Sequence, residues 1–336
     1  MLVAQMVLRR VLLMIPILFG VTLVTFLLAQ VIPADPAVAL AGNTATDEQV
    51  QAIRERLGLD QPIWVQYVNY LERLLAGDLG TSIYSRRPVA GEIALYLPAT
   101  IELATAAIIV ALVIGCTLGV LAAVYRGRFL DHVGRLFAIF GASMPVFWLG
   151  LLLVLIFYTV LGWFPGGGRF DRSVPQPWPW TGFLVLDNLL QLNGPAFIDA
   201  LAHLALPAIT LGIMGAGTIA RVTRASMLEV LSQEYIRAAK AKGLTRRRVL
   251  VVHGVRNALL PTVTIAGLVY GSLLGGAVLT ESIFSWPGLG RYAVDAMFRQ
   301  DFPALMAVVM VIAIAYAVVN LIVDIAYLFL NPTLRR

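Results

Sequence analysis

Residues 232–261, SQEYIRAAKAKGLTRRRVLVVHGVRNALLP, form the one long polar and basic stretch in a chain that is otherwise mostly apolar. Both lysines of the protein, Lys240 and Lys242, lie in it, and seven arginines lie within it or just before it. Apolar runs long enough to cross a bilayer flank it on both sides. A loop between membrane spans that carries helix signals of its own predicts a docking site for a partner outside the membrane.

The composition identifies an integral membrane protein. Hydrophobic residues make up 59% of the chain and charged residues 13%, whereas soluble domains contain about 25% charged residues. Because lipid satisfies no backbone hydrogen bond, apolar runs of this length are helices. We therefore predict an all-α membrane protein. Its six predicted spans are 11–32, 99–124, 133–161, 203–222, 259–280 and 304–330.

The distribution of charge predicts the orientation of the spans. With a cytoplasmic N-terminus, the cytoplasmic side carries 16 of the 25 basic residues and only three acidic ones. The opposite side then carries 9 basic and 15 acidic residues. By the positive-inside rule, both termini are expected in the cytoplasm.

The segment 33–98 is predicted to be a small external helical segment between the first and second spans. Residues 46–57 have acidic residues in the first turn and Gly58 as a stop signal, and 62–75 form a second helical stretch. The segment either packs on the external mouth of the spans or contacts a substrate or partner. The chain thus divides into 1–32 (N-terminal end and first span), 33–98, and a core of 99–336 that includes the cytoplasmic loop 225–258.

Two spans contain polar or helix-breaking residues. In the third span, Pro145 follows Ser143 and Met144 and interrupts the helical hydrogen-bond ladder, either as a packing kink or as part of a translocation path. In the sixth span, Asn320 is a candidate path residue, and Asp324 lies one turn further along the same face. We interpret Asp324 as a structural carboxylate that pairs with a basic loop residue, although an acid within a span is also a functional candidate.

The sequence offers no chemistry for an energy source. A nucleotide-binding P-loop needs Lys between Gly and Ser/Thr, and neither Lys240 nor Lys242 has that context. Three scattered histidines and one cysteine predict no metal site, and no catalytic residues can be proposed. We therefore expect no cofactor in this chain. The scarcity of ionisable residues in the spans also argues against a self-powered carrier.

Within the loop, local signals predict a capped helix. Ser226 and Glu229 form a capping-box pattern for a short helix, and Ser232 is placed to cap a second helix with Glu234 in its first turn. Lys242 lies in the last turn, and Gly243 stands where a left-handed C′ residue is expected. We expect one face to present four residues to a partner: Tyr235, Ala238, Ala239 and Lys242. The competing interpretation is a basic helix lying on anionic lipid.

The spacing Arg237-Ala238-Ala239-x-x-x-Gly243 resembles the EAA loop of ATP-binding-cassette importer permeases, with Arg237 where many members have Glu. The general Leu-Pro of that loop is displaced here to Leu260-Pro261, which is similar to the dipeptide/oligopeptide branch, in particular the first of its two permease subunits. The resemblance covers nearly the whole chain. Its other motifs are Ile32-Pro33, GLDQP (58–62), GDLGTS (77–82), SMPVFW (143–148), TESIFSWPGLGR (280–291), NLIVD (320–324) and NP (331–332).

This resemblance implies the fold of type I importer permeases, in the bacterial cytoplasmic membrane. It implies four kinds of partner and no nucleic acid: a second homologous permease, two cytoplasmic ATPases that bind ATP and Mg, an external solute-binding protein, and the lipid bilayer. It also implies that the chain itself is not an enzyme. The implied coupling residues are Glu234, Tyr235, Arg237, Ala238, Ala239, Lys242 and Gly243.

The expected substrates are dipeptides or short oligopeptides. Related systems that carry nickel, glutathione, opines or oligosaccharides remain alternatives. The alternative from another class is a secondary carrier or channel with a basic regulatory loop.

Overall fold

The computed structural model describes residues 2–31, 36–41, 45–176 and 178–330, and these are predominantly helical. Extended pairing among them is limited to an isolated bridge between Thr81 and Pro88. The predicted end of the first span at Ile32, the Ile32-Pro33 motif and the NP motif at 331–332 lie outside the described residues. The helices are α1 (Leu2–Val31), α2 (Pro36–Ala41), α3 (Asp47–Leu57), α4 (Ile63–Leu75), α5 (Val89–Val124), α6 (Phe129–Ser143), α7 (Val146–Leu153), η1 (Val154–Val160), α8 (Leu184–Leu190), α9 (Gly194–Ser232), α10 (Glu234–Ala241), α11 (Arg246–Arg248), η2 (Val249–Val255), α12 (Arg256–Gly276), α13 (Val278–Ile283), α14 (Leu289–Phe298) and α15 (Phe302–Leu330).

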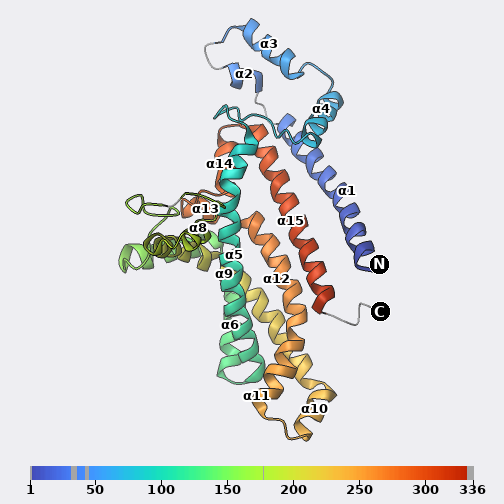
Figure 1. Cartoon of the computed structure of the whole chain (residues 1–336), viewed down its shortest axis with the longest axis vertical. Helices are drawn as coiled ribbons and strands as arrows, with labels where there is room; N and C mark the ends of the chain where they lie inside the picture. The colour runs from blue at the N-terminus through green and yellow to red at the C-terminus, as the bar shows by residue number, and fades with distance from the viewer. Residues whose placement is uncertain (1, 32–35, 42–44, 177, 331–336) are drawn as a thin grey trace.

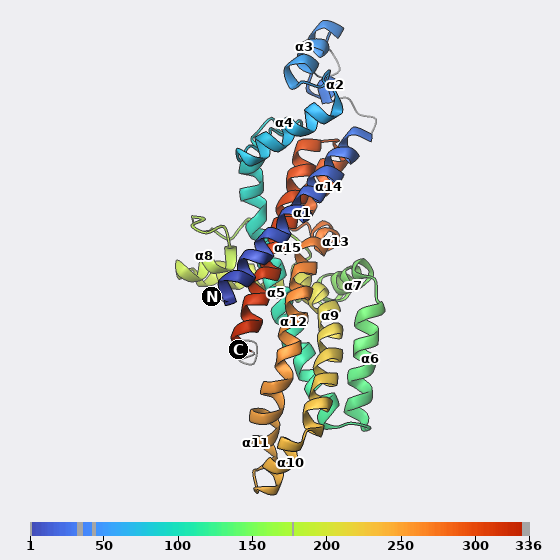
Figure 2. The same cartoon turned by 90° about the vertical axis from the view of Figure 1, so that its right-hand side faces the viewer.

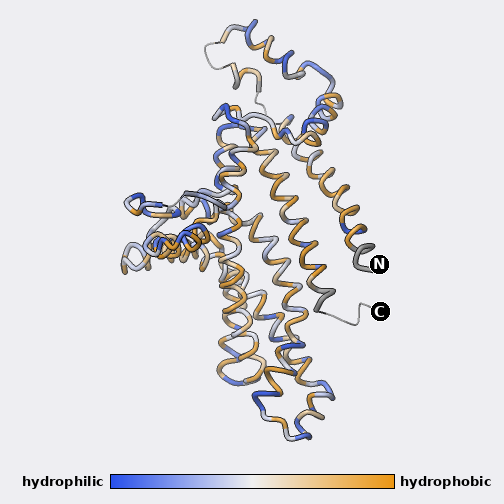
Figure 3. The backbone as a smooth tube through the Cα atoms, in the orientation of Figure 1, coloured by the Kyte–Doolittle hydropathy of each residue, from blue (hydrophilic) through white to orange (hydrophobic). Residues whose placement is uncertain are grey.

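The molecule is elongated, with short helices at both ends of a bundle of long ones (Figures 1 and 2). Helices α2, α3 and α4 lie at one end, called here the α4 end, and α10 and α11 lie at the other, called the α10 end. The long helices are mainly apolar, while polar residues gather at the two ends and in the part around α8 that projects from the side of the bundle (Figure 3). This distribution is the one expected of helices that cross a bilayer and of end segments that meet water.

Five of the six predicted spans are confirmed as single helices. Five helical stretches are long and apolar enough to cross a membrane, and the bent pair α6 with α7–η1 makes a sixth if it is one span. The boundaries were less well predicted. Helix α5 begins ten residues before the predicted 99 because it continues through Pro98, and α9 extends beyond 203–222 at both ends. A proline is tolerated within a long helix where neighbouring elements pack around it, and Gly182 lies directly against Pro98.

The interruption at Pro145 is a sharp corner rather than a kink. Helix α6 ends at Ser143, α7 begins at Val146, and the two axes differ by 106°. Pro145 serves as the N-cap residue of α7, and its carbonyl accepts from the amides of Trp148 and Leu149. Proline has no N–H to continue α6, and it disfavours helical geometry at Met144 before it.

The core of the bundle is the contact between α5 and α9, the most extensive helix pair in the described chain. Gly115 and Gly119 face α9 so closely that a methyl group at Gly119 would lie 2.7 Å from the carbonyl oxygen of Ala220. The spacing of these two glycines is the small-xxx-small pattern that permits helices to approach backbone to backbone. Around this seam, α12 packs on α9 and α5, and α15 and α1 pack outside α12.

The segment between α1 and α5 contains the two predicted helices. Thr46 caps α3 in a capping box with Gln49, and Gly58 ends it in the left-handed conformation with φ of 66°. Helix α4 lies across the end of α1, where Tyr67 and Thr22 share a hydrogen bond of 2.9 Å. The segment thus packs against the end of the bundle.

Candidate functional site

The predicted docking loop is an extension of the bundle at the α10 end, but it begins differently from the prediction. Helix α9 is continuous through Ser232, so Ser226 and Glu229 do not start a separate helix. Ser226 is buried inside α9, and the Ser232 hydroxyl donates to the carbonyl of Glu229 (2.7 Å) instead of capping α10. The predicted caps are therefore wrong, because packing of the α9 apolar face outweighs a local cap signal.

Helix α10 ends as its sequence predicts. The chain turns at Gly243, whose φ is 77°, and the amide of Gly243 donates to the carbonyl of Lys240 (3.0 Å). The amide of Leu244 donates to the carbonyl of Ala239 (3.3 Å). These two bonds form a Schellman motif, in which the hydrophobic contact of Leu244 with Ala239 is the usual companion. These contacts fix the direction in which the chain leaves the C-terminal end of α10.

One face of α10 is buried against the loop itself. Ile236 is fully buried, Ala239 is 8% exposed, and both pack with Val249 at the start of η2. Ala239 was expected on the docking face, and this expectation is wrong. The helical period places Ile236 and Ala239 three residues apart on one face, and that face fills the small core between α10 and η2.

The opposite face of α10 is open to solvent. Of the other predicted docking residues, Glu234, Tyr235, Arg237, Ala238, Lys242 and Gly243 are all exposed. The Tyr235 hydroxyl accepts a hydrogen bond from the side chain of Asn257 (3.0 Å), whose amide nitrogen also donates to the His253 carbonyl. Sequence reasoning missed Asn257, because nothing in the local pattern links it to a residue 22 positions earlier.

The exposed surface of this loop is strongly basic. Arg246, Arg247 and Arg248 follow the turn and are exposed, with Thr245 accepting from the Arg248 amide as the cap of α11. Together with Arg237, Lys240 and Lys242 they outnumber the single acid Glu234. Small exposed residues beside a basic rim suit a contact with an acidic groove on another protein.

The candidate path residues do not form one site. Ser143, Met144 and Pro145 lie at the corner between α6 and α7, where they line a shallow cavity of about 370 Å³ with Phe140, Phe147 and Trp148. Asn320 lies on α15, which packs on α12 and α1, whereas the α6–α7 corner packs on α9. The structure therefore does not bring the two predicted parts of the path together.

Asp324 forms an ion pair, as expected, but with a different partner. Its carboxylate lies 2.9 Å from Nε of Arg10 and accepts a hydrogen bond of 3.2 Å from Nη2 of the same guanidinium. Arg10 belongs to α1 and not to a loop. The pair joins the first and last long helices at the ends away from α4.

Two further carboxylates, Glu102 and Glu281, are buried and have partners that the sequence did not indicate. Glu102 on α5 pairs with Arg169 at 2.6 Å and accepts from the Val185 amide at 2.7 Å. Glu281 on α13 is fully buried and accepts from the Thr100 hydroxyl and the Arg291 amide. Both connections join α5 to segments far away in the chain, so the sequence pattern alone carried no signal of the partners.

Among the residues described, no group of three or more His, Cys, Asp or Glu side chains is placed to hold a metal ion.

The chain matches known transport proteins over nearly its full length. Residues 115–336 match the family described as binding-protein-dependent transport system inner membrane component, and residues 3–104 match the N-terminal family of the same components. The chain is 49% identical to a probable D,D-dipeptide transport system permease protein of Escherichia coli, covering 94% of this chain and 93% of that protein. It is 46% identical to a di/tripeptide transport system permease protein of Pseudomonas aeruginosa, covering 98% of each. A dipeptide transport system permease protein of Escherichia coli is 46% identical, with 99% of each covered.

Proposed function

The chain belongs to the family of inner membrane components of binding-protein-dependent transport systems, and from this membership we propose that it is a permease subunit that imports dipeptides or short oligopeptides. Relatives with peptide systems in their names are 46–49% identical over nearly the whole chain. A glutathione transport system permease protein of Salmonella choleraesuis is 40% identical, so a modified tripeptide is an alternative substrate. The proposed energy source is ATP hydrolysis by two partner ATPases, which bind ATP and Mg.

The proposed coupling role depends on α10, which has one face buried against the loop and the opposite face exposed. Its inner face is packed on η2, and its exit is closed by the Schellman motif at Gly243. The exposed residues of its outer face include Tyr235, Arg237, Ala238 and Lys242. Ala238 is the smallest of them and leaves room for another protein to approach the helix. Helix α10 follows α9 directly and is connected to α12 through α11 and η2. A displacement of α10 by a partner bound to its outer face would therefore displace these two long helices as well. We assign this outer face as the contact with one ATPase.

The proposed orientation puts the α10 end in the cytoplasm and the α4 end outside. The basic surface of the loop supports this, because cytoplasmic segments carry the excess of Arg and Lys. Both chain termini are then cytoplasmic, and the external solute-binding protein meets the α4 end. A second homologous permease completes the pathway. The residues 143–145 and Asn320 are proposed to line parts of it that the second subunit brings together.

The docking role can be tested with Ala238→Trp in the transporter reconstituted in proteoliposomes with its ATPases and binding protein. A large side chain at the centre of the contact keeps the ATPase at a distance, so dipeptide uptake is expected to fall at least about tenfold, the effect of losing ~1.4 kcal/mol of contact. The matched control is Ala238→Ser, which keeps a small side chain at the same exposed position. Uptake by Ala238→Trp equal to that of Ala238→Ser at equal membrane levels would show that α10 is not the contact.

The energy source is tested separately. Uptake in the wild-type proteoliposomes should require internal ATP and persist when a proton conductor is added, while the isolated chain hydrolyses no ATP. Uptake driven by a proton gradient without ATP would identify a secondary carrier.

The orientation is tested by labelling Ser232→Cys and Gln51→Cys in a Cys116→Ala background with an impermeant maleimide, and only Gln51→Cys should react from outside.

A further inference from the structure

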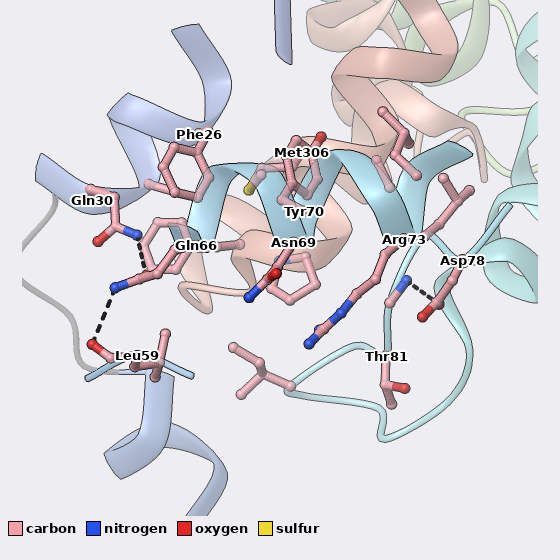
Figure 4. Close-up of a pocket in the computed structure, with 18 of the residues that line it drawn as sticks. Phe26, Gln30, Leu59, Gln66, Asn69, Tyr70, Arg73, Asp78, Thr81 and Met306 are labelled. Carbon is pink, nitrogen blue, oxygen red and sulfur yellow. Dashed lines mark hydrogen bonds between the residues drawn. The ribbon is translucent and has the colours of Figure 1, made fainter. Parts of the chain in front are cut away.

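A cavity of about 570 Å³ lies at the α4 end, where α1, α4, the 78–83 loop and the start of α15 meet. Its lining includes Phe26 and Ala29 from α1, and Phe302 and Met306 from α15 (Figure 4). These residues belong to the last two turns of the apolar stretch Val7–Gln30 and the first two turns of Phe302–Ala326. The cavity therefore lies at the level where the apolar zone of both spans ends. Its volume is in the range of small-molecule sites.

The polar residues that line the cavity come mainly from α4 and the 78–83 loop, with Gln30 from α1 and Arg54 from α3. The side chain of Gln30 donates to the amide oxygen of Gln66 (3.0 Å), and Gln66 donates to the carbonyls of Leu59 and Gln61. The carboxylate of Asp78 accepts from the Gly80 amide.

Two hydrogen-bond donors that line the cavity, Asn69 and Arg73, have side chains without a hydrogen-bond or ion-pair partner among the described residues. Because they are four residues apart on α4, they lie on one helical face, and both reach into the cavity from that face (Figure 4).

The cavity is remote from the core of the bundle. Helix α1 packs on α15 and α4, whereas the core seam is formed by α5 and α9 with α12 beside them. Most large side chains of α1 between Leu8 and Leu28 are exposed, so this face of the bundle is open to lipid or to another subunit. An occupant thus reaches the cavity from the membrane or its surface, and not from between α5 and α9.

We propose that this cavity binds one glycerophospholipid, with its phosphate held by Arg73 and Asn69 and its acyl chains lying along Phe26, Ala29 and Met306. A guanidinium matches a phosphate in charge and in the geometry of its donors. An apolar wall at the depth of the span ends suits the first segments of acyl chains, and a dissolved phosphate would leave that wall in contact with water. The bound lipid fills the space between α1, α4 and α15 and so holds α4 against the spans.

Native mass spectrometry of the full-length chain, purified in mild detergent with the subunits that accompany it, tests the proposal. After removal of loosely bound lipid, the protein is titrated with dioleoylphosphatidylglycerol. One lipid should bind to the wild type, and Arg73→Gln should weaken this binding about tenfold, because a hydrogen-bonded charge pair is lost. Arg56→Gln, an exposed arginine on α3 that does not line the cavity, should bind as the wild type does.

Two further measurements test whether the apolar lining is needed and whether a soluble phosphate compound can replace the lipid. Ala29→Trp, which fills the apolar part and keeps Arg73, should also remove the bound lipid. Glycerol phosphate, the soluble headgroup, should not compete at millimolar concentration. Equal losses in Arg73→Gln and Arg56→Gln, unchanged binding to Ala29→Trp, or displacement by glycerol phosphate would each overturn the proposal, the last in favour of a soluble anion site.

Discussion

The side chain of Asn257, at the start of α12, donates a hydrogen bond of 3.0 Å to the hydroxyl of Tyr235 in the first turn of α10. The same amide nitrogen donates to the carbonyl of His253 (2.9 Å), so Asn257 is itself held in place by the preceding turn. This link joins the exposed helix of the loop to the helix that crosses the membrane after it. Helix α10 is therefore connected to α12 through a side chain as well as through the intervening backbone.

Removing this link should loosen α10 without unfolding the loop. In Tyr235→Phe the aromatic ring stays and only the hydroxyl is lost, at a cost of about 1 kcal/mol. Amide hydrogen exchange in α10 is expected to accelerate about fivefold, while exchange in α5 stays as in the wild type. Asn257→Ala combined with Tyr235→Phe should add no further acceleration in α10, and an additive effect would mean that the two residues act independently.

The left-handed turn at Gly243 should be required for coupling beyond its effect on stability. Gly243→Ala strains the backbone by about 1 kcal/mol, because a Cβ disfavours a positive φ. Gly127→Ala is a matched control: Gly127 has φ of 74° in the turn between α5 and α6, and both glycines have open space around them. Thermal unfolding should shift equally in the two variants, and only Gly243→Ala should reduce uptake per ATP hydrolysed. Equal transport in both would remove Gly243 from the coupling contact.

The buried pair of Glu102 and Arg169 should be a major determinant of stability. Glu102 is 8% exposed and also accepts from the Val185 amide, so Glu102→Gln leaves Arg169 without its charge partner in a buried site. Breaking one side of such a pair costs about 3 kcal/mol or more. The midpoint of thermal unfolding, followed by a thiol-reactive dye at Cys116, should fall clearly in this variant.

A double-mutant cycle isolates the pair itself. Arg169→Met combined with Glu102→Gln should recover part of the loss, because no unpaired charge remains. Arg172→Gln, an exposed arginine on the same loop, should leave the midpoint unchanged. If Glu102→Gln unfolds at the wild-type temperature, the ion pair does not stabilise the fold.

The pair of Arg10 and Asp324 should contribute to assembly rather than to substrate choice. Their side chains are 51% and 28% exposed, so the pair is worth about 1 kcal/mol or less. Asp324→Asn should lower the amount of assembled transporter moderately, and Arg10→Gln should lower it by the same amount. The ratio of uptake rates for different dipeptides should stay constant in both. A changed ratio at normal protein levels would place Asp324 in contact with substrate.

The sequence alone determined the elements whose cause is local or periodic. Apolar length predicted the six spans, and the broken pattern at Pro145 predicted an interruption of the third. Gly58 and Gly243 predicted helix ends, because only glycine adopts a left-handed conformation without strain. These features depend on residues within a few turns of one another, so a single stretch of sequence contains their physical cause.

The tertiary structure decided which side chains meet. It buried Ala239 against Ile236 and Val249, so that only part of the predicted docking face is open. It extended α9 through the expected capping box at Ser226, since burial of an apolar face is worth more than one cap. The partners of Glu102, Asp324 and Tyr235 lie 67, 314 and 22 residues away, and no local pattern identifies them. Such contacts depend on how whole helices cross, which is set by the packing of the entire bundle.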